Sequence, residues 1–494
     1  MDDRGKRVVE IVNKWAIVNK GFGYVVAPPG SGKTRLGVIA SYLIKKNKPD
    51  AKVLVITPSQ DVLGHWIAED PKRYITNFMT ITELINSDSA IEVDLLILDE
   101  THKYQSASRF EKIESIKTKY RLDLYGVAPE KKPKLPLVDE ISFTEAYINN
   151  WILDVKEVNV EIPMTTGEIY RYTTLCNHIE RVNNDNFLLW KRISNKHPEY
   201  DSVFTLLQGC AQNITVEIKS GDDYVKRIIN QQDTIELIQK EMNFDLTYIV
   251  KNNNSPIDEV HKLYNSDALK ALGNSYMNNL RIRSELLVNM ENKKEFTHML
   301  IKHMPDFRKL VYCESIQACD NLYNSLMDST DISIEDKSKI GVIHSKIKSV
   351  PETDDLGNVV TFKTGKVKMI SPERQKKYLI EALNNGTITT ILVVNSLNEG
   401  TDVPNLSLIV NLGGSRDKVK YIQRRGRAAR LGDEEGKEPI MINLVASDII
   451  MGNKEYPNYD KIKINRRQGS DLKVMKIASN QLNLVLQLCK KKTH

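Results

Sequence analysis

Short apolar runs alternate with longer amphipathic segments in the first third of the chain, and the same alternation returns near its end. Runs of this length, rich in β-branched residues, predict buried strands, and the segments between them predict helices. The predicted strands are 23–27, 53–57, 95–98, 310–313, 340–343, 390–394, 408–412 and 439–445. This rhythm is typical of βαβ units and predicts an α/β fold with two parallel-sheet units.

The middle of the chain has a different pattern. Leu, Ile and Met recur at helical spacing over residues 222–243 and 267–290. We therefore expect a helical insertion between the two units. The predicted organisation is a first unit over 1–155, the insertion or linker over 156–305, a second unit over 306–450 and a basic C-terminal tail over 451–494.

Two further stretches have loop-like or turn-like composition. Residues 128–138 carry three prolines and three lysines and predict a crossing without regular structure. Residues 349–370 predict an inserted β-hairpin with its turn at 356–358. Its second half carries Lys363, Lys366 and Lys368, which either insert at a nucleic-acid fork or form a solvated face, the more common role of such a charge run.

Composition excludes several classes of protein. The 494 residues are 41% hydrophobic and 27% charged, as in ordinary globular proteins. No apolar run approaches the length of a membrane span and the N-terminus is polar, so we expect a cytoplasmic protein. The five cysteines are scattered without a C-x-x-C pair, which argues against a zinc site. The net charge of +6 permits an anionic partner without requiring one.

Residues 27–34, APPGSGKT, follow a predicted strand and open a predicted helix. In that context the pattern predicts a P-loop rather than a chance glycine-rich turn. Backbone N–H groups would wrap phosphate oxygens, the Lys33 ammonium would neutralise them, and the Thr34 hydroxyl would ligate Mg²⁺. The candidate nucleotide-binding residues of the loop are Pro29, Gly30, Ser31, Gly32, Lys33 and Thr34.

Two adjacent carboxylates follow the predicted strand 95–98. The carboxyl end of a strand is where a doubly wound sheet places its ligands. Asp99 would bind the metal ion, and Glu100 would accept a proton from an attacking water. Alone, the pair could be a solvated strand end, but its place downstream of a P-loop favours the catalytic interpretation.

Residues 421–430, YIQRRGRAAR, lie near the end of the second α/β unit. Arg427 and Arg430 are three apart and can share one helical face, from which guanidinium groups can bind γ-phosphate charge. A basic helix that is solvated, or that binds nucleic-acid phosphates, is the alternative.

Six segments in order resemble the motifs of superfamily 2 helicases and translocases of the DExH type. They are APPGSGKT (27–34, motif I), LVITPSQDVLGHW (54–66, Ia), LLILDETH (95–102, II), LVYCES (310–315, IV), SLNEGTDVPNLSLIV (396–410, V) and QRRGRAAR (423–430, VI). The resemblance implies two RecA-like lobes with a helical insertion between them, and an enzyme that hydrolyses ATP with Mg²⁺.

The resemblance also implies roles for single residues. Gly400 and Asp402 would lie near the ribose, and Gln423 would face the nucleotide with Arg427 and Arg430 as arginine fingers. The backbone of the nucleic acid would be gripped by Thr57, Pro58 and Ser315. His102 would couple the two lobes, or else be a satisfied buried histidine.

Two departures from the family pattern affect these expectations. Residues 124–129, LYGVAP, keep the outline of motif III without its hydroxyls, which leaves the coupling of hydrolysis to strand separation open. No glutamine precedes the P-loop where the family reads adenine, and Arg4, Lys6 and Arg7 occupy that region. Triphosphate binding is therefore predicted more firmly than adenine specificity.

Within the superfamily the chain looks most similar to phage and bacterial DNA repair and recombination helicases of the branch-migration type. This favours a monomeric DNA helicase acting on forked or branched DNA in replication, recombination or repair, in the host cytoplasm if a bacteriophage encodes it. An RNA helicase, a nucleic-acid-binding module without strand separation and a small-molecule P-loop kinase are the alternatives.

Overall fold

The computed structural model describes residues 2–87, 89–104, 106–129, 133–220, 223–252, 265–352, 359–361, 366–394, 403, 406–413, 418–430, 438–446, 475–478 and 487. The chain divides into two compact units. Unit 1 comprises Met1–Pro163 and Asn292–His494, and unit 2 comprises Met164–Glu291. Unit 1 contains two separate parallel sheets, which we call lobe 1 and lobe 2.

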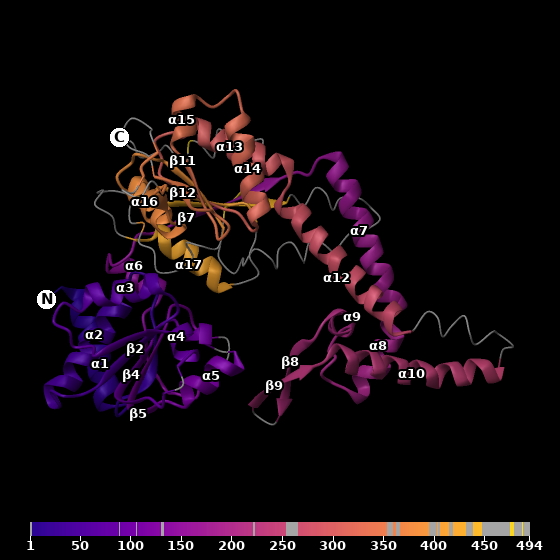
Figure 1. Ribbon diagram of the computed structural model, residues 1–494, viewed down its shortest axis with the longest axis horizontal. Helices are drawn as coiled ribbons and strands as arrows, with labels where there is room; N and C mark the ends of the chain where they lie inside the picture. Colours follow the sequence, from indigo (N-terminus) through magenta and orange to yellow (C-terminus); the bar gives the residue numbers. More distant parts are fainter. Residues whose placement is uncertain are drawn as a thin grey trace. The chain divides into compact units, whose positions relative to one another are not determined.

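Lobe 1 is built on a six-stranded sheet in the order β3-β2-β4-β5-β1-β6, with every strand pair parallel (Figure 1). Its strands are β1 (Phe22–Val26), β2 (Val53–Thr57), β3 (Asn77–Thr80), β4 (Glu92–Leu98), β5 (Lys117–Tyr125) and β6 (Leu137–Glu140). All five residues of β2 are buried, because a parallel sheet is covered on both faces.

Helices cover both faces of this sheet. One face packs against α1 (Asp3–Ile17), α2 (Lys33–Asn47) and α3 (Gln60–Glu69). The other face packs against α4 (Ile81–Ile85), the 3₁₀ helix η1 (Thr101–Tyr104) and α5 (Ala107–Glu114). The short helix α6 (Phe143–Ile148) follows β6. The alternation within β2 fits this arrangement, since Val53 and Val55 join the first core and Leu54 and Ile56 the second.

Lobe 2 is built on a seven-stranded sheet in the order β11-β14-β10-β15-β16-β7-β17, again entirely parallel. Its strands are β7 (Lys156–Ile162), β10 (Lys309–Tyr312), β11 (Ile340–Ile343), β14 (Thr390–Val393), β15 (Leu408–Asn411), β16 (Ile440–Ala446) and β17 (Met475–Ala478). Its helices are α13 (Glu291–His303), α14 (Ile316–Asp328), α15 (Ile334–Ser338), α16 (Pro372–Asn384) and α17 (Lys418–Ala428).

Three asparagines form a buried ladder across the lobe 2 sheet. Asn411, Asn443 and Asn159 stand in register on β15, β16 and β7. The amide of Asn411 donates to Asn443 Oδ1 at 2.8 Å, and that of Asn443 donates to Asn159 Oδ1 at 3.0 Å. Buried amides are tolerated because they bond to one another.

The predicted hairpin over 349–370 is present at its base. Strands β12 (Val350–Pro351) and β13 (Met369–Ile370) pair antiparallel, and Thr361 bridges Val367. The predicted turn at 356–358 and Lys363 lie outside the described residues. Lys368 is bound at the base by an ion pair of 2.9 Å to Glu352.

Unit 2 consists mainly of helices. They are α7 (Thr166–Asp185), α8 (Phe187–Lys196), α9 (Val203–Ala211), α10 (Gln231–Asn252) and α12 (Ser266–Val288). The long helices α7 and α12 lie side by side (Figure 1). An antiparallel hairpin of β8 (Ile214–Ser220) and β9 (Asp223–Ile229) adds a small sheet.

The structure differs from the sequence prediction in several places. Residues 137–138 of the crossing predicted over 128–138 belong to strand β6. Residues 156–162 form β7 of lobe 2, so unit 2 begins at Met164 and the predicted insertion at 156 began too early. Residues 223–229 of the helix predicted over 222–243 form β9, because the hairpin partner β8 pairs with it over its whole length. Part of the predicted basic tail, Met475–Ala478, adds β17 to the lobe 2 sheet.

Within the described part of the chain, no helix is both long enough and apolar enough to span a membrane. Four cysteines lie in that part, Cys176, Cys210, Cys313 and Cys319, and all are buried as free thiols.

Candidate functional site

The loop between β1 and α2 has the backbone of a phosphate-binding turn. Gly30 and Gly32 have φ values of 85° and 105°, a region in which a side chain is strained. Ser31 Oγ donates to the carbonyl of Pro28 at 2.7 Å and closes the turn. Helix α2 starts directly afterwards at Lys33. Its N-terminus offers unpaired N–H groups and the positive end of the helix dipole, both of which favour an anion.

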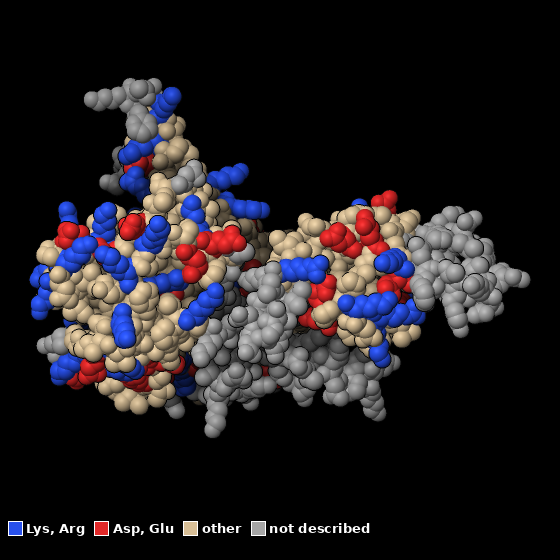
Figure 2. Space-filling model, turned by 90° about the horizontal axis from the view of Figure 1, so that it is seen from below, with Lys and Arg blue, Asp and Glu red and all other residues tan. Residues whose placement is uncertain are grey.

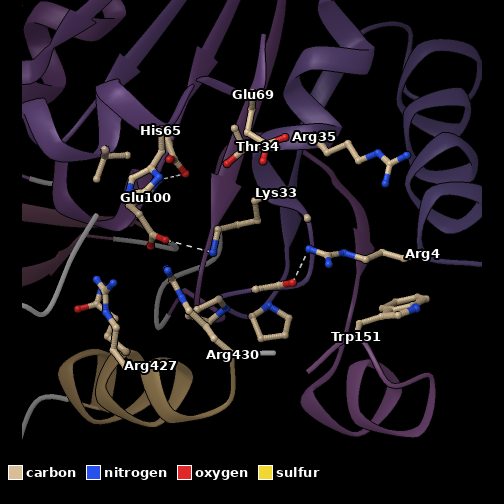
Figure 3. A pocket seen from close by; sticks show the side chains of 17 residues that line it. Arg4, Lys33, Thr34, Arg35, His65, Glu69, Glu100, Trp151, Arg427 and Arg430 are labelled. Atoms are coloured by element: carbon tan, nitrogen blue, oxygen red, sulfur yellow. Dashed lines mark hydrogen bonds and ion pairs between the residues drawn. The ribbon is translucent and has the colours of Figure 1, made fainter. Parts of the chain in front are cut away.

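The ammonium of Lys33 is held at the mouth of this loop (Figure 3). Its Nζ atom donates to the carbonyl of Ala27 and lies 3.1 Å from Glu100 Oε1. Both charged side chains are largely buried, at 11% and 15% exposed. The predicted phosphate-binding cation and the predicted proton acceptor are therefore paired with each other.

The two adjacent carboxylates stand where β4 ends, as predicted. Asp99 accepts two hydrogen bonds, from Trp66 Nε1 to its Oδ2 at 2.8 Å and from the Glu100 N–H to its Oδ1 at 3.0 Å. The backbone of Glu100 has φ of 50°, a left-handed conformation that is uncommon outside glycine. Such strain is concentrated at functional sites, where the surrounding structure maintains it.

Burial and neighbouring charges shift the pKa values of the two carboxylates in opposite directions. Burial, and then the neighbouring Glu100 charge, raise the pKa of Asp99. Burial opposes ionisation of Glu100 too, but the positive charges of Lys33 and His102 outweigh it and lower the pKa of Glu100. Glu100 is thus held as a carboxylate. Within the described part of the chain its Oε2 accepts no hydrogen bond, although His102 Nδ1 lies 3.4 Å away.

These groups line one pocket of about 470 Å³. Residues of both lobes contribute to its wall, as Figure 3 shows. The lining residues are Arg4, Pro28, Pro29, Gly30, Gly32, Lys33, Thr34, Arg35, Val62, His65, Glu69, Asp99, Glu100, Trp151, Gln423, Arg427 and Arg430. The structure thus brings together most of the predicted residues of motifs I, II and VI, but Ser31 of motif I and His102 of motif II do not line the pocket.

Helix α17 carries the contribution of lobe 2. Gly426 lies against lobe 1 so closely that a Cβ atom there would be 2.7 Å from Pro29 Cγ. Arg424 is buried on the opposite side, with Nη1 donating to Glu314 Oε1 at 3.1 Å and its guanidinium 4.5 Å from the Tyr312 ring centroid. The helix ends at Ala428, so Arg430 reaches the pocket from just beyond it rather than from the shared helical face that was predicted.

The remaining predicted residues are placed as follows. Gly400 and Asp402 lie outside the described residues. Thr57 is buried at the end of β2 and donates to the carbonyl of Ser59 at 3.1 Å, next to the half-buried Pro58. Ser315 caps α14 by accepting a hydrogen bond from the Ala318 N–H. The hydroxyls of Thr57 and Ser315 are therefore both used within the protein.

The oxygen ligands in the pocket suit Mg²⁺. Thr34 and Asp99 both line it beside the phosphate-binding loop. No cluster of three or more His, Cys, Asp or Glu side chains that could hold a metal occurs among the described residues. Few protein ligands are needed, because Mg²⁺ in phosphate sites takes most of its shell from water and phosphate oxygens.

Three residues of the site had no predicted role or a less specific one. Arg4 Nη2 donates to the carbonyl of Gly30 at 2.5 Å, which binds α1 to the phosphate loop. Trp66 donates to Asp99, and Gly126 lies against Glu100 and Lys33. The charged N-terminus and the altered motif III segment drew attention to Arg4 and Gly126, but only their position in space shows what they touch.

Two family models match parts of the chain. Residues 6–93 match the model described as type III restriction enzyme, res subunit. Residues 292–432 match the helicase conserved C-terminal domain. The first match covers the phosphate loop, and the second covers α17 with Arg427 and Arg430.

Two curated relatives and one solved structure are similar to the chain. An uncharacterised ATP-dependent helicase of Methanocaldococcus jannaschii is 23% identical over 379 residues, covering 66% of this chain and 54% of that protein. The DNA 3'-5' translocase XPB2 of Sulfurisphaera tokodaii is 33% identical over 87 residues, 18% of each chain. The structure of S. cerevisiae Dbp5 bound to RNA and ADP BeF3 gives a TM-score of 0.51 at 11% identity, covering 99% of this chain and 93% of that one.

The chain spans about half, or less, of the length of these two curated relatives. The structural likeness establishes the fold, which is the two-lobe RecA-like architecture that the sequence predicted. Together, the match of lobe 1 to the restriction-enzyme model, the match of lobe 2 to the helicase model, the helicase relative and this architecture make the chain similar to superfamily 2 helicases.

Proposed function

We propose that this protein is an ATP-dependent helicase or translocase that moves along nucleic acid. The proposal rests on one observation. Lys33 and Glu100 of lobe 1 line the same pocket as Arg427 and Arg430 of lobe 2. A small-molecule kinase would have no need of arginines supplied by a second RecA-like lobe. An arrangement that requires both lobes instead suits a motor whose hydrolysis depends on the approach of the lobes.

The chain's own residues suggest how the site works. The N–H groups of the phosphate loop would bind the triphosphate, and Lys33 would exchange its bond to Glu100 for a phosphate oxygen. That exchange leaves the Glu100 carboxylate free to accept a proton from the attacking water. Arg427 and Arg430 would stabilise the charge that develops on the γ-phosphate, while Gln423 would contact the nucleotide.

Mg²⁺, held by Thr34 and Asp99, would neutralise phosphate charge. In this scheme the Asp99 carboxylate and the Thr34 hydroxyl would each offer an oxygen ligand to the metal ion. Because both residues also line the wall occupied by Lys33, metal and ammonium would act on the same phosphate group.

We also propose DNA, forked or branched in repair or recombination, as the substrate. Regional similarity to a DNA translocase supports DNA, and regional similarity of the same extent to a pre-mRNA-splicing RNA helicase makes RNA the second candidate. Among the described residues on the face drawn in Figure 2, lysines and arginines are interspersed with acidic and neutral residues and form no continuous basic track for a nucleic-acid strand. Backbone contacts of scattered cations would give binding that weakens with salt.

The test is phosphate release from ATP without nucleic acid and with single-stranded DNA, forked DNA, four-way DNA and single-stranded RNA at one salt concentration. We expect the greatest stimulation by branched DNA. Stimulation by RNA alone would change the substrate, turnover indifferent to nucleic acid would indicate a kinase, and ATP binding without turnover would indicate a binding module.

Two variants test the site itself. Lys33→Ala and Arg430→Ala should each abolish stimulated turnover, because one removes the phosphate-binding ammonium and the other a lobe 2 guanidinium. Lys46→Ala, an exposed position near the end of the same helix α2, is the control and should retain it. Retained turnover in both site variants would refute the assignment.

A further inference from the structure

Trp66 lies between helix α2 and the Asp99 carboxylate, and it does not line the pocket. It stands on α3 and is fully buried. Its indole Nε1 donates to Asp99 Oδ2 at 2.8 Å. The edge of the indole that carries Cη2 and Cζ3 faces Gly37 on α2, one helical turn after the phosphate loop. One side chain therefore touches both the helix that follows the loop and the carboxylate at the end of β4.

The edge of the ring that faces Gly37 packs tightly against α2. A Cβ atom on Gly37 would lie 2.3 Å from Trp66 Cη2 and 2.7 Å from Cζ3. Real Cβ atoms do not come that close, so the glycine is what allows the indole to occupy this position. The ring is thereby fixed in the plane from which its N–H reaches Asp99.

The Asp99 carboxylate is in turn held at both oxygens. Oδ2 receives the indole N–H, and Oδ1 receives the Glu100 N–H at 3.0 Å. A carboxylate with one donor could rotate about its Cβ–Cγ bond, whereas two donors from different elements define its plane. The remaining lone pairs then have fixed directions.

We propose that Trp66 is a positioning residue that orients the Asp99 carboxylate for Mg²⁺ and keeps it in register with the phosphate loop. The proposal rests on the proposed function, because it assumes that nucleotide and Mg²⁺ bind in this pocket. Residues that hydrogen-bond to metal ligands typically change metal affinity by tenfold to a hundredfold when they are removed. Trp66 would act on the metal without touching it.

The experiment compares Trp66→Phe with Trp15→Phe. Trp15 is a matched control because it is also fully buried in lobe 1, and its indole donates to the carbonyl of Arg121 at 3.1 Å, away from the pocket. ATP affinity is measured by calorimetry in excess Mg²⁺ and in EDTA. The ratio of the two dissociation constants reports the contribution of the metal independently of turnover.

In Trp66→Phe we expect ATP affinity in EDTA to stay within about twofold of the native protein and the gain from Mg²⁺ to fall by about tenfold. Trp15→Phe should leave that gain unchanged, even though loss of ring volume lowers its melting temperature. An unchanged gain in Trp66→Phe, or an equal loss in Trp15→Phe, would overturn the proposal.

Gly37→Ala provides a second route if the phenylalanine variant does not fold. It retains the indole donor but forces the ring away, since the added methyl group cannot fit. Mg²⁺ should again increase ATP affinity less than it does in the native protein. An unaltered increase would refute the positioning role. Failure of the native protein to bind ATP at all would instead refute the proposed function, so the two failures are distinguishable.

Discussion

The backbone of Gly126 passes so close to Glu100 that a Cβ atom on Gly126 would lie 2.8 Å from Glu100 Oε2 and 3.2 Å from Lys33 Nζ. Gly126 follows β5, the strand beside β4, in the segment where the family carries motif III hydroxyls. In this protein the segment thus supplies space for the ion pair. A side chain at this position would displace the Glu100 carboxylate from its place beside Lys33.

Gly126→Ala should therefore disable hydrolysis. The added methyl group would displace the Glu100 carboxylate, and displacement of a catalytic group by about 1 Å can lower turnover on the order of a hundredfold. Nucleic-acid-stimulated phosphate release and the melting temperature are measured together. Gly167→Ala is the control and should retain turnover. Apart from its chain neighbours and its own helix, no described atom would lie within 4 Å of the added Cβ. Full activity of Gly126→Ala would show that the carboxylate is not needed where it stands.

Glu100→Gln should bind ATP more tightly while losing turnover. The substitution removes the 3.1 Å ion pair that holds Lys33 away from phosphate, and it removes a negative charge from the pocket. We expect the dissociation constant to fall about tenfold, equivalent to about 1.4 kcal/mol. Equilibrium binding of ATP checks this.

Asp94→Asn serves as the control for that measurement. Asp94 lies on the same strand β4, and its carboxylate pairs with Lys48 at 3.0 Å outside the pocket. Loss of this pair should lower stability and leave ATP affinity unchanged. If the two variants changed ATP affinity equally, the effect would come from general charge rather than from the Lys33 pair.

Lys309 should make the stability of the protein depend on pH. It is fully buried at the start of β10, its Nζ donates to the carbonyl of Phe307, and burial lowers its pKa to about 7. The unfolded chain keeps the ordinary higher pKa, so between pH 7 and about 10 it binds more protons than the folded protein. The free energy of unfolding should therefore rise with pH across this window.

Lys309→Met removes the titrating group and retains most of its volume. Native protein should gain stability relative to this variant, on the order of a few kcal/mol, as pH rises from 7 to 10. Denaturant unfolding at several pH values measures the difference. Parallel curves for the two proteins would contradict a lowered pKa at this position.

The asparagine ladder should show strong coupling between its members. Asn443→Leu leaves the amide of Asn411 and the carbonyl oxygen of Asn159 without their partner from the ladder, which should cost about 2–4 kcal/mol. Asn159→Leu combined with Asn443→Leu should cost less than the sum of the single changes, because both members of one hydrogen bond are then apolar. Unfolding of the four proteins in a double-mutant cycle measures this, and additivity within about 0.5 kcal/mol would rule out coupling.

Sequence reasoning selected the glycine-rich loop, the acidic pair and the lobe 2 arginines, which the structure brings to one pocket, because each stands out by its local sequence. A strand that is buried on both faces, such as β2, can also be predicted, because its sequence is a continuous apolar run. The sequence of β7, KEVNVEI, is not such a run, because charged residues and the buried Asn159, which accepts a hydrogen bond from Asn443 on β16, interrupt its apolar positions. The strand β17 lies in a segment whose charge suggested a tail.

The detailed contacts of the site could not be predicted from the sequence, because they too depend on residues that are distant in the chain. The bond from Trp66 to Asp99 forms because α3 packs against β2, the strand next to β4, and Gly37 leaves room for the ring. Arg430 was expected on a helix, but α17 ends two residues earlier and the pocket is reached from the following turn. Each of these facts depends on tertiary packing that no local pattern encodes.

The pairing of β7 with β16 has a consequence for how the protein is made. Asn159 and its hydrogen-bond partner Asn443 are separated by 284 positions in the chain. At a synthesis rate of about 5–20 residues per second, β7 leaves the ribosome roughly 15 to 60 s before the strand it pairs with. During that interval its edge is open to a chaperone or to a neighbouring nascent chain. Lobe 1 can fold while translation continues, but the lobe 2 sheet is complete only after β16 and β17 have also been synthesised.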